Sequence, residues 1–170
     1  MLNKSQAAAH VWSVLCSSSV IDQSSNNLTL FNTLERVTIT IPKSEAEKIK
    51  KQISTQGAKG FLFPIPFELV NLFHKTEAQK AAAFDVRIRL LAPSGEEIQL
   101  VTERKIAIEK DKRNFRLRSQ FTNFPVSSEG EYTFLVEMRD VDSSNYVEVA
   151  SVPLEIFIKE NTVSPKNKQG

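Results

Sequence analysis

The chain offers few residues for nucleophilic catalysis: one cysteine and two histidines. A thiol nucleophile needs a thiolate-prone cysteine, a base within hydrogen-bond distance and a third group that orients the base. Cys16 lies in an apolar stretch, where a buried thiol is unreactive. His10 is about 20 Å away along an extended strand, so the two side chains cannot touch. We therefore expect Cys16 to pack in the core, and we predict no catalytic residue.

Metal binding has one candidate, a loop that contains Asp140, Asp142 and Asn145. Their oxygen atoms suit Ca²⁺, but two carboxylates are too few for a site of six or more oxygens. The histidines and the cysteine match no zinc-ligand spacing, and the five glycines are too isolated for a phosphate-binding loop. We therefore predict no metal and no cofactor, with an ordinary turn in this loop.

A cationic face is the strongest polar pattern. Arg87 and Arg89 point outward on one predicted strand, and Arg116 and Arg118 do so on another. If these strands share a sheet, the four arginines form a face able to meet phosphates or an acidic partner. The alternative is a solvated outer face balanced by nearby glutamates. Because the net charge is only +2 and no outward aromatic residues interleave with the arginines, we do not expect a dedicated nucleic-acid binder.

A second candidate surface is the apolar stretch from Phe61 to Phe67, which contains Phe63, Pro64 and Pro66. Proline cannot donate to a β-ladder, so this stretch is expected at a sheet edge or in a crossing between sheets. An exposed edge can bind a partner. The candidate binding residues are thus Arg87, Arg89, Arg116, Arg118, Phe61 and Phe63.

The elements that must position these residues are predicted to be strands. Tyr132, Phe134, Val136 and Met138 recur at period two behind Gly130, so they share one face. A Gly-x-Tyr pattern at the head of a strand is typical of the tyrosine corner of two-sheet sandwiches, in which the hydroxyl bonds to the preceding backbone.

Two further segments are informative. The apolar parity changes near Glu35 within 28–41, which predicts a bulge or bend. Residues 44–56 fit a short amphipathic helix with Ser44 as N-cap and a thin apolar stripe of Ile49 and Ile53. We expect loops at 17–27 and 140–145.

The strand spacing, the single helix and the absence of repeats favour an all-β fold: an antiparallel two-sheet sandwich of immunoglobulin or C2 type, with a closed barrel as the alternative. A chain of 170 residues with 41% hydrophobic content can bury a core as one domain. We place this domain at 9–159, with flexible tails at 1–8 and 160–170.

Several of these segments are also similar to a known family. The chain resembles a group of short bacterial proteins described only as a domain of unknown function, single β-sandwiches of immunoglobulin or C2 type. The likeness spans roughly residues 9 to 158 and implies no activity, cofactor or catalytic residue. The segments that carry it are structural: Val14–Cys16, Leu28–Asn32, Phe67–Val70, Arg89–Gly95 and Gly130–Phe134.

The N-terminal stretch up to Cys16 loosely resembles a lipoprotein signal. His10 interrupts its apolar part, and Leu15 stands where cleavage needs a small residue. We therefore expect a cytoplasmic protein, with a secreted or lipid-anchored sandwich attached through Cys16 as the alternative. No apolar run is long enough for a membrane span.

The predicted function is a non-enzymatic binding or assembly module that acts through a sheet face or an edge. The expected partner is another protein of unknown identity or a second copy of the chain, with nucleic acid a weaker candidate. The alternative is an enzyme of unrecognised type, which would need a deep pocket lined by His74, Glu68 or Asp85.

Overall fold

The computed structural model describes residues 7–56 and 60–161. Strands make up most of this part of the chain, with one helix, so the all-β prediction is confirmed. In chain order the elements are β1 (Ala8–Ile21), β2 (Leu28–Thr33), β3 (Arg36–Pro42), α1 (Lys43–Gln56), β4 (Phe61–Phe63), β5 (Phe67–Lys75), β6 (Ala82–Leu91), β7 (Glu97–Ile108), β8 (Asn114–Phe121), β9 (Phe124–Val126), β10 (Gly130–Asp140) and β11 (Val147–Asn161).

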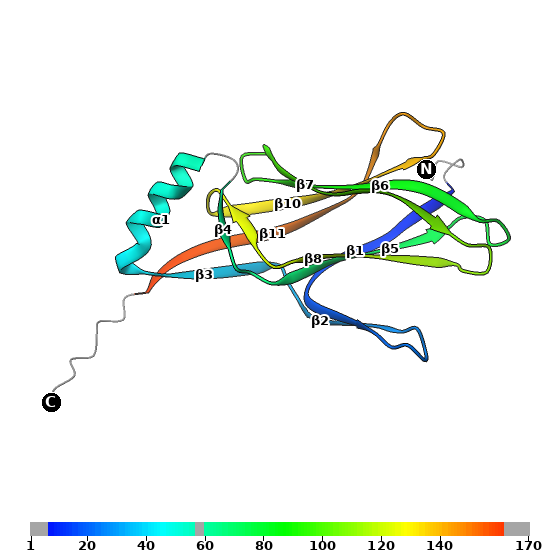
Figure 1. Cartoon of the computed structure of the whole chain (residues 1–170), viewed down its shortest axis with the longest axis horizontal. Coiled ribbons are helices and arrows are strands. Elements are labelled where there is room, and N and C mark those ends of the chain that lie inside the picture. The colour runs from blue at the N-terminus through cyan, green and yellow to red at the C-terminus, as the bar shows by residue number, and fades with distance from the viewer. Residues whose placement is uncertain (1–6, 57–59, 162–170) are drawn as a thin grey trace.

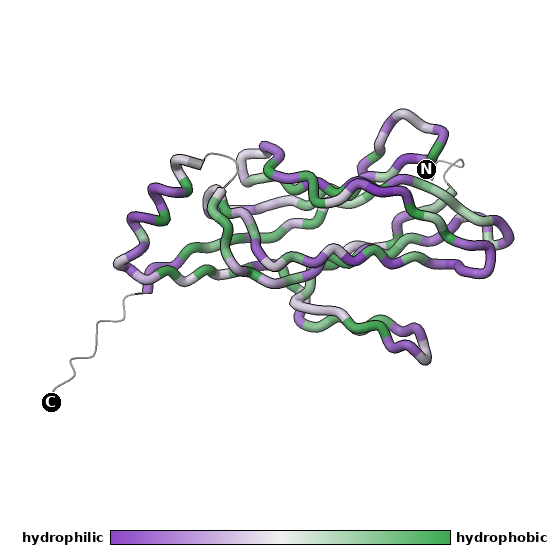
Figure 2. Tube along the Cα trace, viewed as in Figure 1, coloured by the Kyte–Doolittle hydropathy of each residue, from purple (hydrophilic) through white to green (hydrophobic). Residues whose placement is uncertain are grey.

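The strands form three sheets. Sheet A has the order β2-β1-β5-β8, sheet B has the order β3-β11-β10-β6-β7, and sheet C is the pair β4-β9. Pairing is antiparallel except between β3 and β11, which run parallel. Sheets A and B lie as two layers (Figure 1), and their facing side chains form one hydrophobic cluster. Hydrophobic and hydrophilic residues alternate along many of these strands (Figure 2), as burial of one face requires.

Aromatic side chains join the two layers. Phe67 of β5 stacks on Phe121 of β8, with ring centroids 4.5 Å apart, and its edge meets Phe134 of β10. Phe73 of β5 lies tilted against Phe84 of β6, with ring centroids 5.4 Å apart. Phenylalanine side chains therefore make contacts both within sheet A and between sheets A and B.

The tyrosine corner is present at the start of β10. The Tyr132 hydroxyl accepts hydrogen bonds from the backbone N–H groups of Ser127 and Ser128, at 2.7 and 3.1 Å, and donates to the Ser128 carbonyl at 2.8 Å. The Tyr132 side chain is fully buried. Gly130 has a φ of 128°, a conformation that favours glycine. The predicted turn and strand are confirmed here.

The parity change near Glu35 is a crossover between sheets. β2 ends at Thr33 in sheet A, and β3 begins at Arg36 in sheet B. The Leu34 N–H still bonds to the Leu15 carbonyl in sheet A, whereas the Glu35 carbonyl accepts from Glu155 in sheet B. The parity of the buried residues changes between β2 and β3 because the two strands lie in different sheets, which face the core from opposite sides.

The predicted loop at 17–27 is too long. β1 continues to Ile21 and pairs with β2 through Ser18↔Phe31 and Ile21↔Leu28, so only the tip forms a loop. This hairpin, here called the β1–β2 arm (residues 17–33), extends away from the layers (Figure 1). Its serines misled the prediction because an exposed strand needs no apolar alternation.

The helix is confirmed at Lys43–Gln56. It begins one residue earlier than predicted, so Ser44 lies in the first turn and not at the N-cap. Ala46 lies on the buried side of the helix, and Lys50 forms an ion pair with Glu160 at 2.6 Å. Gly57, the predicted helix stop, lies outside the described residues.

The apolar stretch after the helix is partly as expected. Phe61 and Phe63 form the short strand β4, which pairs with β9, and Pro64 and Pro66 stay outside every ladder. However, Phe63 is only 7% exposed and belongs to the core. Its side chain is therefore unsuited to a docking surface, because it fills the space that sheet C closes.

The predicted domain limits shift slightly. β1 begins at Ala8, and β11 continues to Asn161. The other residues of the predicted tails lie almost entirely outside the described part of the chain.

Candidate functional site

The four predicted arginines do not form one face. Arg87 and Arg89 are on β6 in sheet B, whereas Arg116 and Arg118 are on β8 in sheet A. The chain passes into the other layer in the turn after β7, so the condition that the strands share a sheet is not met. The hypothesis of a single cationic face is therefore wrong.

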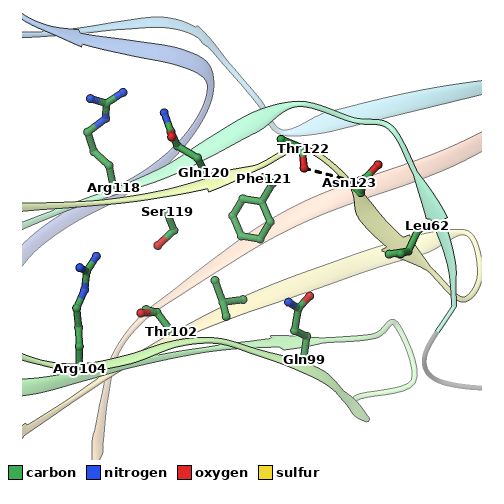
Figure 3. Close-up of a pocket in the computed structure, with 11 residues that line it drawn as sticks. Leu62, Gln99, Thr102, Arg104, Arg118, Ser119, Gln120, Phe121, Thr122 and Asn123 are labelled. Carbon is green, nitrogen blue, oxygen red and sulfur yellow. Dashed lines mark hydrogen bonds between the residues drawn. The ribbon is translucent and has the colours of Figure 1, made fainter.

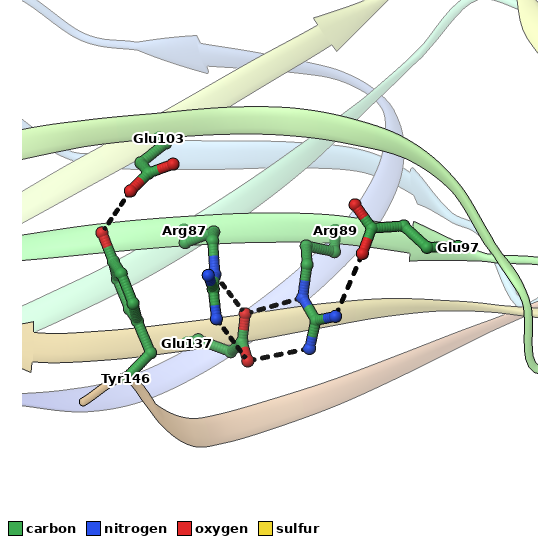
Figure 4. Close-up of polar contacts among 6 residues, drawn as sticks. All are labelled: Arg87, Arg89, Glu97, Glu103, Glu137 and Tyr146. Carbon is green, nitrogen blue, oxygen red and sulfur yellow. Dashed lines mark hydrogen bonds and ion pairs between the residues drawn. The ribbon is translucent and has the colours of Figure 1, made fainter.

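The sheet B pair is already bound by carboxylates within the chain (Figure 4). Arg87 and Arg89 donate to Glu137 of β10, with Nε–Oε2 distances of 2.7 and 2.9 Å. Arg89 also contacts Glu97, and the Arg87 guanidinium lies 4.1 Å from the centroid of the Tyr146 ring. Burial favours a higher pKa for Glu137, but the bonds and charges of the two arginines outweigh it, so its pKa lies below its ordinary value.

The sheet A pair holds the β1–β2 arm. Arg118 donates to both carboxylate oxygens of Glu68 and, at 3.0 Å, to the Ser19 carbonyl. The Ser19 hydroxyl donates to the same carboxylate. Arg116 reaches Asn26 at the tip of the arm at 3.1 Å. These arginines therefore have a structural role on the outer face of sheet A.

Cys16 lies beneath the arm and is fully buried. Burial raises the pKa of its thiol, and the nearby negative charge of Glu68 acts in the same direction. A protonated, buried thiol is a poor nucleophile, which agrees with the packing role predicted for Cys16.

The residues of the alternative enzyme pocket are not brought together. His74 donates from Nδ1 to Asn114 at 2.7 Å and accepts from Arg113 at Nε2. Glu68 is bound to Arg118 in sheet A, and Asp85 is bound to Arg139 in sheet B. His74 thus meets no carboxylate among the described residues.

A short polar chain on sheet A escaped the sequence analysis. His10 Nε2 lies 2.7 Å from the Ser13 hydroxyl, which donates to Asn71 Oδ1 at 2.6 Å. Because the single hydroxyl proton of Ser13 goes to Asn71, His10 must act as the donor and does not activate the serine. Burial lowers the pKa of His10, although a backbone bond at Trp12 opposes this. This chain is therefore arranged for structure and not for nucleophilic attack.

A cleft of about 460 Å³ lies between the facing edges of the two layers. β7 is the outermost strand of sheet B, and β8 is the outermost strand of sheet A. Side chains from both strands point into the cleft, among them Thr102 and Arg104 from β7 and Ser119 and Phe121 from β8 (Figure 3). Exposed Leu62 of β4 borders one end.

Strand register explains why polar side chains point inward here. Directly paired residues of neighbouring strands point to the same face. Thr102 pairs with Ile88 and Arg104 with Val86, and both partners are fully buried core residues. Ser119 likewise pairs with buried Leu69. The two polar edges therefore continue the core faces outward, where the layers separate and solvent enters.

The cleft is equipped for hydrogen bonding. No aspartate, glutamate, histidine or cysteine is among its described lining residues. The side chains of Gln99, Thr102 and Ser119 have no hydrogen-bond partner within residues 7–56 and 60–161, and Arg104 has no ion pair there. Phe121 supplies an apolar floor. Such a lining can bind an extended ligand through hydrogen bonds and an apolar contact.

The backbones that border the cleft are also available. Each edge strand has one side with no ladder partner among the described strands. A strand edge of this kind presents a row of N–H and C=O groups that another extended segment can use.

The sequence carried a weak signal for this cleft. Arg104 and Thr102 continue the inward parity of Ile106 and Ile108, and Ser119 continues that of Leu117. In a sequence, polar residues at inward positions indicate that a strand is ending. Only the knowledge that β7 and β8 lie at sheet edges would have shown otherwise. The cleft was therefore missed.

Across the described residues there is no group of three or more histidine, cysteine, aspartate or glutamate side chains that could hold a metal ion. The Asp140 carboxylate accepts a hydrogen bond from the Ala7 N–H. In the same part of the chain, the helix is neither long nor apolar enough to cross a bilayer.

Comparison with known proteins gives no family. No family model matches the chain, and no curated protein matches it significantly. Among solved structures it is similar to a beta-glucosidase from Listeria innocua in complex with glucose, at 9% identity and a TM-score of 0.39, over 74% of this chain and 15% of that one. It is also similar to the N-terminal domain of PorA, at 12% identity and a TM-score of 0.32, over 87% and 98%.

The chain thus spans less than a fifth of the glucosidase it resembles. TM-scores this low support no assignment of fold family or function.

Proposed function

We propose that the protein is a non-enzymatic binding module that takes an extended segment of another polypeptide into the cleft between β7 and β8. The observation that carries this proposal is the cleft itself, because two unpaired strand edges and unused polar side chains border one space. Backbone groups of either edge would supply hydrogen bonds, and Phe121 would receive an apolar side chain of the ligand.

The size of the cleft supports a short segment. A space of about 460 Å³ lies within the range of pockets that bury small ligands. The lining contains hydroxyl and amide groups that can pair with a peptide backbone, from Gln99, Thr102 and Ser119. Binding, without turnover, is the activity for which this lining has the chemistry.

We also propose that the two layers form a sandwich of immunoglobulin or C2 type. Two facing layers and a tyrosine corner support an immunoglobulin- or C2-like sandwich, which is also the fold of the uncharacterised bacterial family that the sequence resembles. A cytoplasmic location remains a prediction.

A random peptide library displayed on phage tests the binding function. We expect the wild-type protein to enrich peptides rich in β-forming residues. Ser119→Trp, which fills the cleft, should abolish enrichment of the same peptides. Ser151→Trp is the matched control, because Ser151 is an exposed strand residue on β11 that does not line the cleft.

Two results would overturn the proposal. One is no enrichment above an empty support. The other is equal enrichment by Ser119→Trp and the wild type, which would place binding elsewhere. Concentration-dependent dimerisation that is lost in Ser119→Trp, without peptide enrichment, would show that a second copy and not another polypeptide fills the cleft.

A further inference from the structure

Arg104 differs from the other cationic side chains near the cleft because no described acidic side chain pairs with it. Every other arginine discussed above has a polar or acidic partner, whereas the Arg104 side chain has no ion pair or hydrogen bond with any residue that the structure describes. Its neighbour across the cleft, Arg118, is bound by Glu68. The cleft thus contains one available guanidinium.

The Arg104 side chain points into the cleft, where its charge can meet a ligand. Its strand position pairs with buried Val86, so the side chain leaves β7 on the core side and not on the outer face. Figure 3 shows it pointing across the cleft toward β8, with Ser119 facing it. A cation that only improved solubility would be equally well placed on the outer face, as Lys105 is.

The charge of the lining favours a negatively charged ligand group. Arg104 and Arg118 are the charged residues among its described members, and although Glu68 balances Arg118 from outside the lining, no described carboxylate balances Arg104. A guanidinium matches the geometry of a carboxylate with two parallel hydrogen bonds. The ligand group that complements this position is therefore a carboxylate.

From this charge and geometry we propose that the polypeptide bound in the cleft carries an aspartate or glutamate side chain that pairs with Arg104. This inference depends on the proposed binding function and names the chemistry of its ligand. A side-chain carboxylate fits better than a chain-terminal one, because β7 extends from Glu97 to Ile108 on both sides of Arg104. An extended segment can thus pass the arginine in both directions.

The experiment uses the peptides enriched from the library and a matched set in which each acidic residue is replaced by its amide. Affinities are measured for the wild-type protein, Arg104→Gln and Lys105→Gln. Lys105 is the control because it is the next residue of the same strand, is exposed and does not line the cleft. Arg104 is exposed, so its replacement should not disturb folding.

We expect one acidic position to recur in the enriched peptides. Arg104→Gln should weaken binding of these peptides about tenfold, the scale of one charged hydrogen-bonded pair. It should change binding of the amide peptides by less than about twofold, because the pair is then already absent. Lys105→Gln should leave both sets unchanged.

Enriched peptides that lack a recurring acidic position, or an equal loss for acidic and amide peptides in Arg104→Gln, would overturn the acidic-ligand inference. In either case, loss of enrichment in Ser119→Trp would still support the cleft as a binding site. If no peptide is enriched, the binding function itself fails.

Discussion

Glu137 lies between two arginine side chains on the outer face of sheet B, and this makes stability depend on pH. Its pKa in the folded protein is below the unfolded value, so the folded state favours the ionised form. The contribution of Glu137 is therefore full above about pH 4.5 and is lost as the pH falls through the lower folded pKa.

Glu137→Gln should reduce the free energy of unfolding at pH 7 by about 1 to 2 kcal/mol, since the arginines remain partly exposed to screening solvent. The loss should be smaller at pH 3, where the wild-type carboxylate is being protonated. Urea denaturation at both pH values measures this difference. Glu131→Gln, an exposed change on the same strand, is the control. An equal loss at both pH values would contradict the ionic role of Glu137.

Tyr132 gives a second test at the level of single residues. Tyr132→Phe removes a buried hydroxyl and leaves two backbone N–H groups without their acceptor. We expect a loss of about 1 to 3 kcal/mol in unfolding free energy. Tyr146→Phe removes one contact to exposed Glu103 and should cost less than about 1 kcal/mol. Urea denaturation compares the two variants, and similar losses would show that the corner is not a stability element.

At the level of elements, the β1–β2 arm depends on a small polar anchor. Glu68 binds Arg118 and Ser19, and Arg118 also holds the Ser19 carbonyl. Glu68→Ala should therefore loosen the arm while leaving the layers in place. Amide hydrogen exchange should accelerate in 17–33 and stay unchanged in β6 and β10.

The control for this prediction is Arg36→Gln, which breaks an exposed ion pair with Glu155 at another sheet edge. It should leave exchange in the arm unchanged. Uniform acceleration over the whole chain in Glu68→Ala would mean that Glu68 supports the whole fold and not the arm.

Several of the strands could be predicted from the sequence, and others could not. Strands with one buried face were clear, because the alternation in Phe84–Leu90 and Tyr132–Met138 reflects core burial. The arm was missed because an edge hairpin in solvent has no such alternation. The crossover near Glu35 was detected as a change of parity, but its meaning depended on which sheet receives β3.

The candidate site was less predictable than the fold. The sequence singled out Arg87, Arg89, Arg116 and Arg118, which are all committed to contacts within the chain. It overlooked Arg104, because nothing local shows that an inward position at 104 opens into solvent. The cleft exists because β7 and β8, the edge strands of two different sheets, face each other. Long-range strand pairing sets this arrangement.

At the scale of the whole molecule, one side lies open between the two layers. Sheets A and B close around an aromatic core, but their edges at β7 and β8 separate and leave a polar cleft. The other ends of these sheets are β2, in the arm, and β3, beside α1. A bound segment should therefore protect one side of the molecule and leave those other edges unaffected.

Amide hydrogen exchange with and without an enriched peptide tests whether the ligand binds between β7 and β8. We predict that exchange slows in 97–104 of β7 or in 114–121 of β8, because a new strand covers the free edge, while exchange in β2 and β3 does not change. Slowing confined to β2 or β3, or bound peptide with no slowing in either cleft strand, would contradict the account.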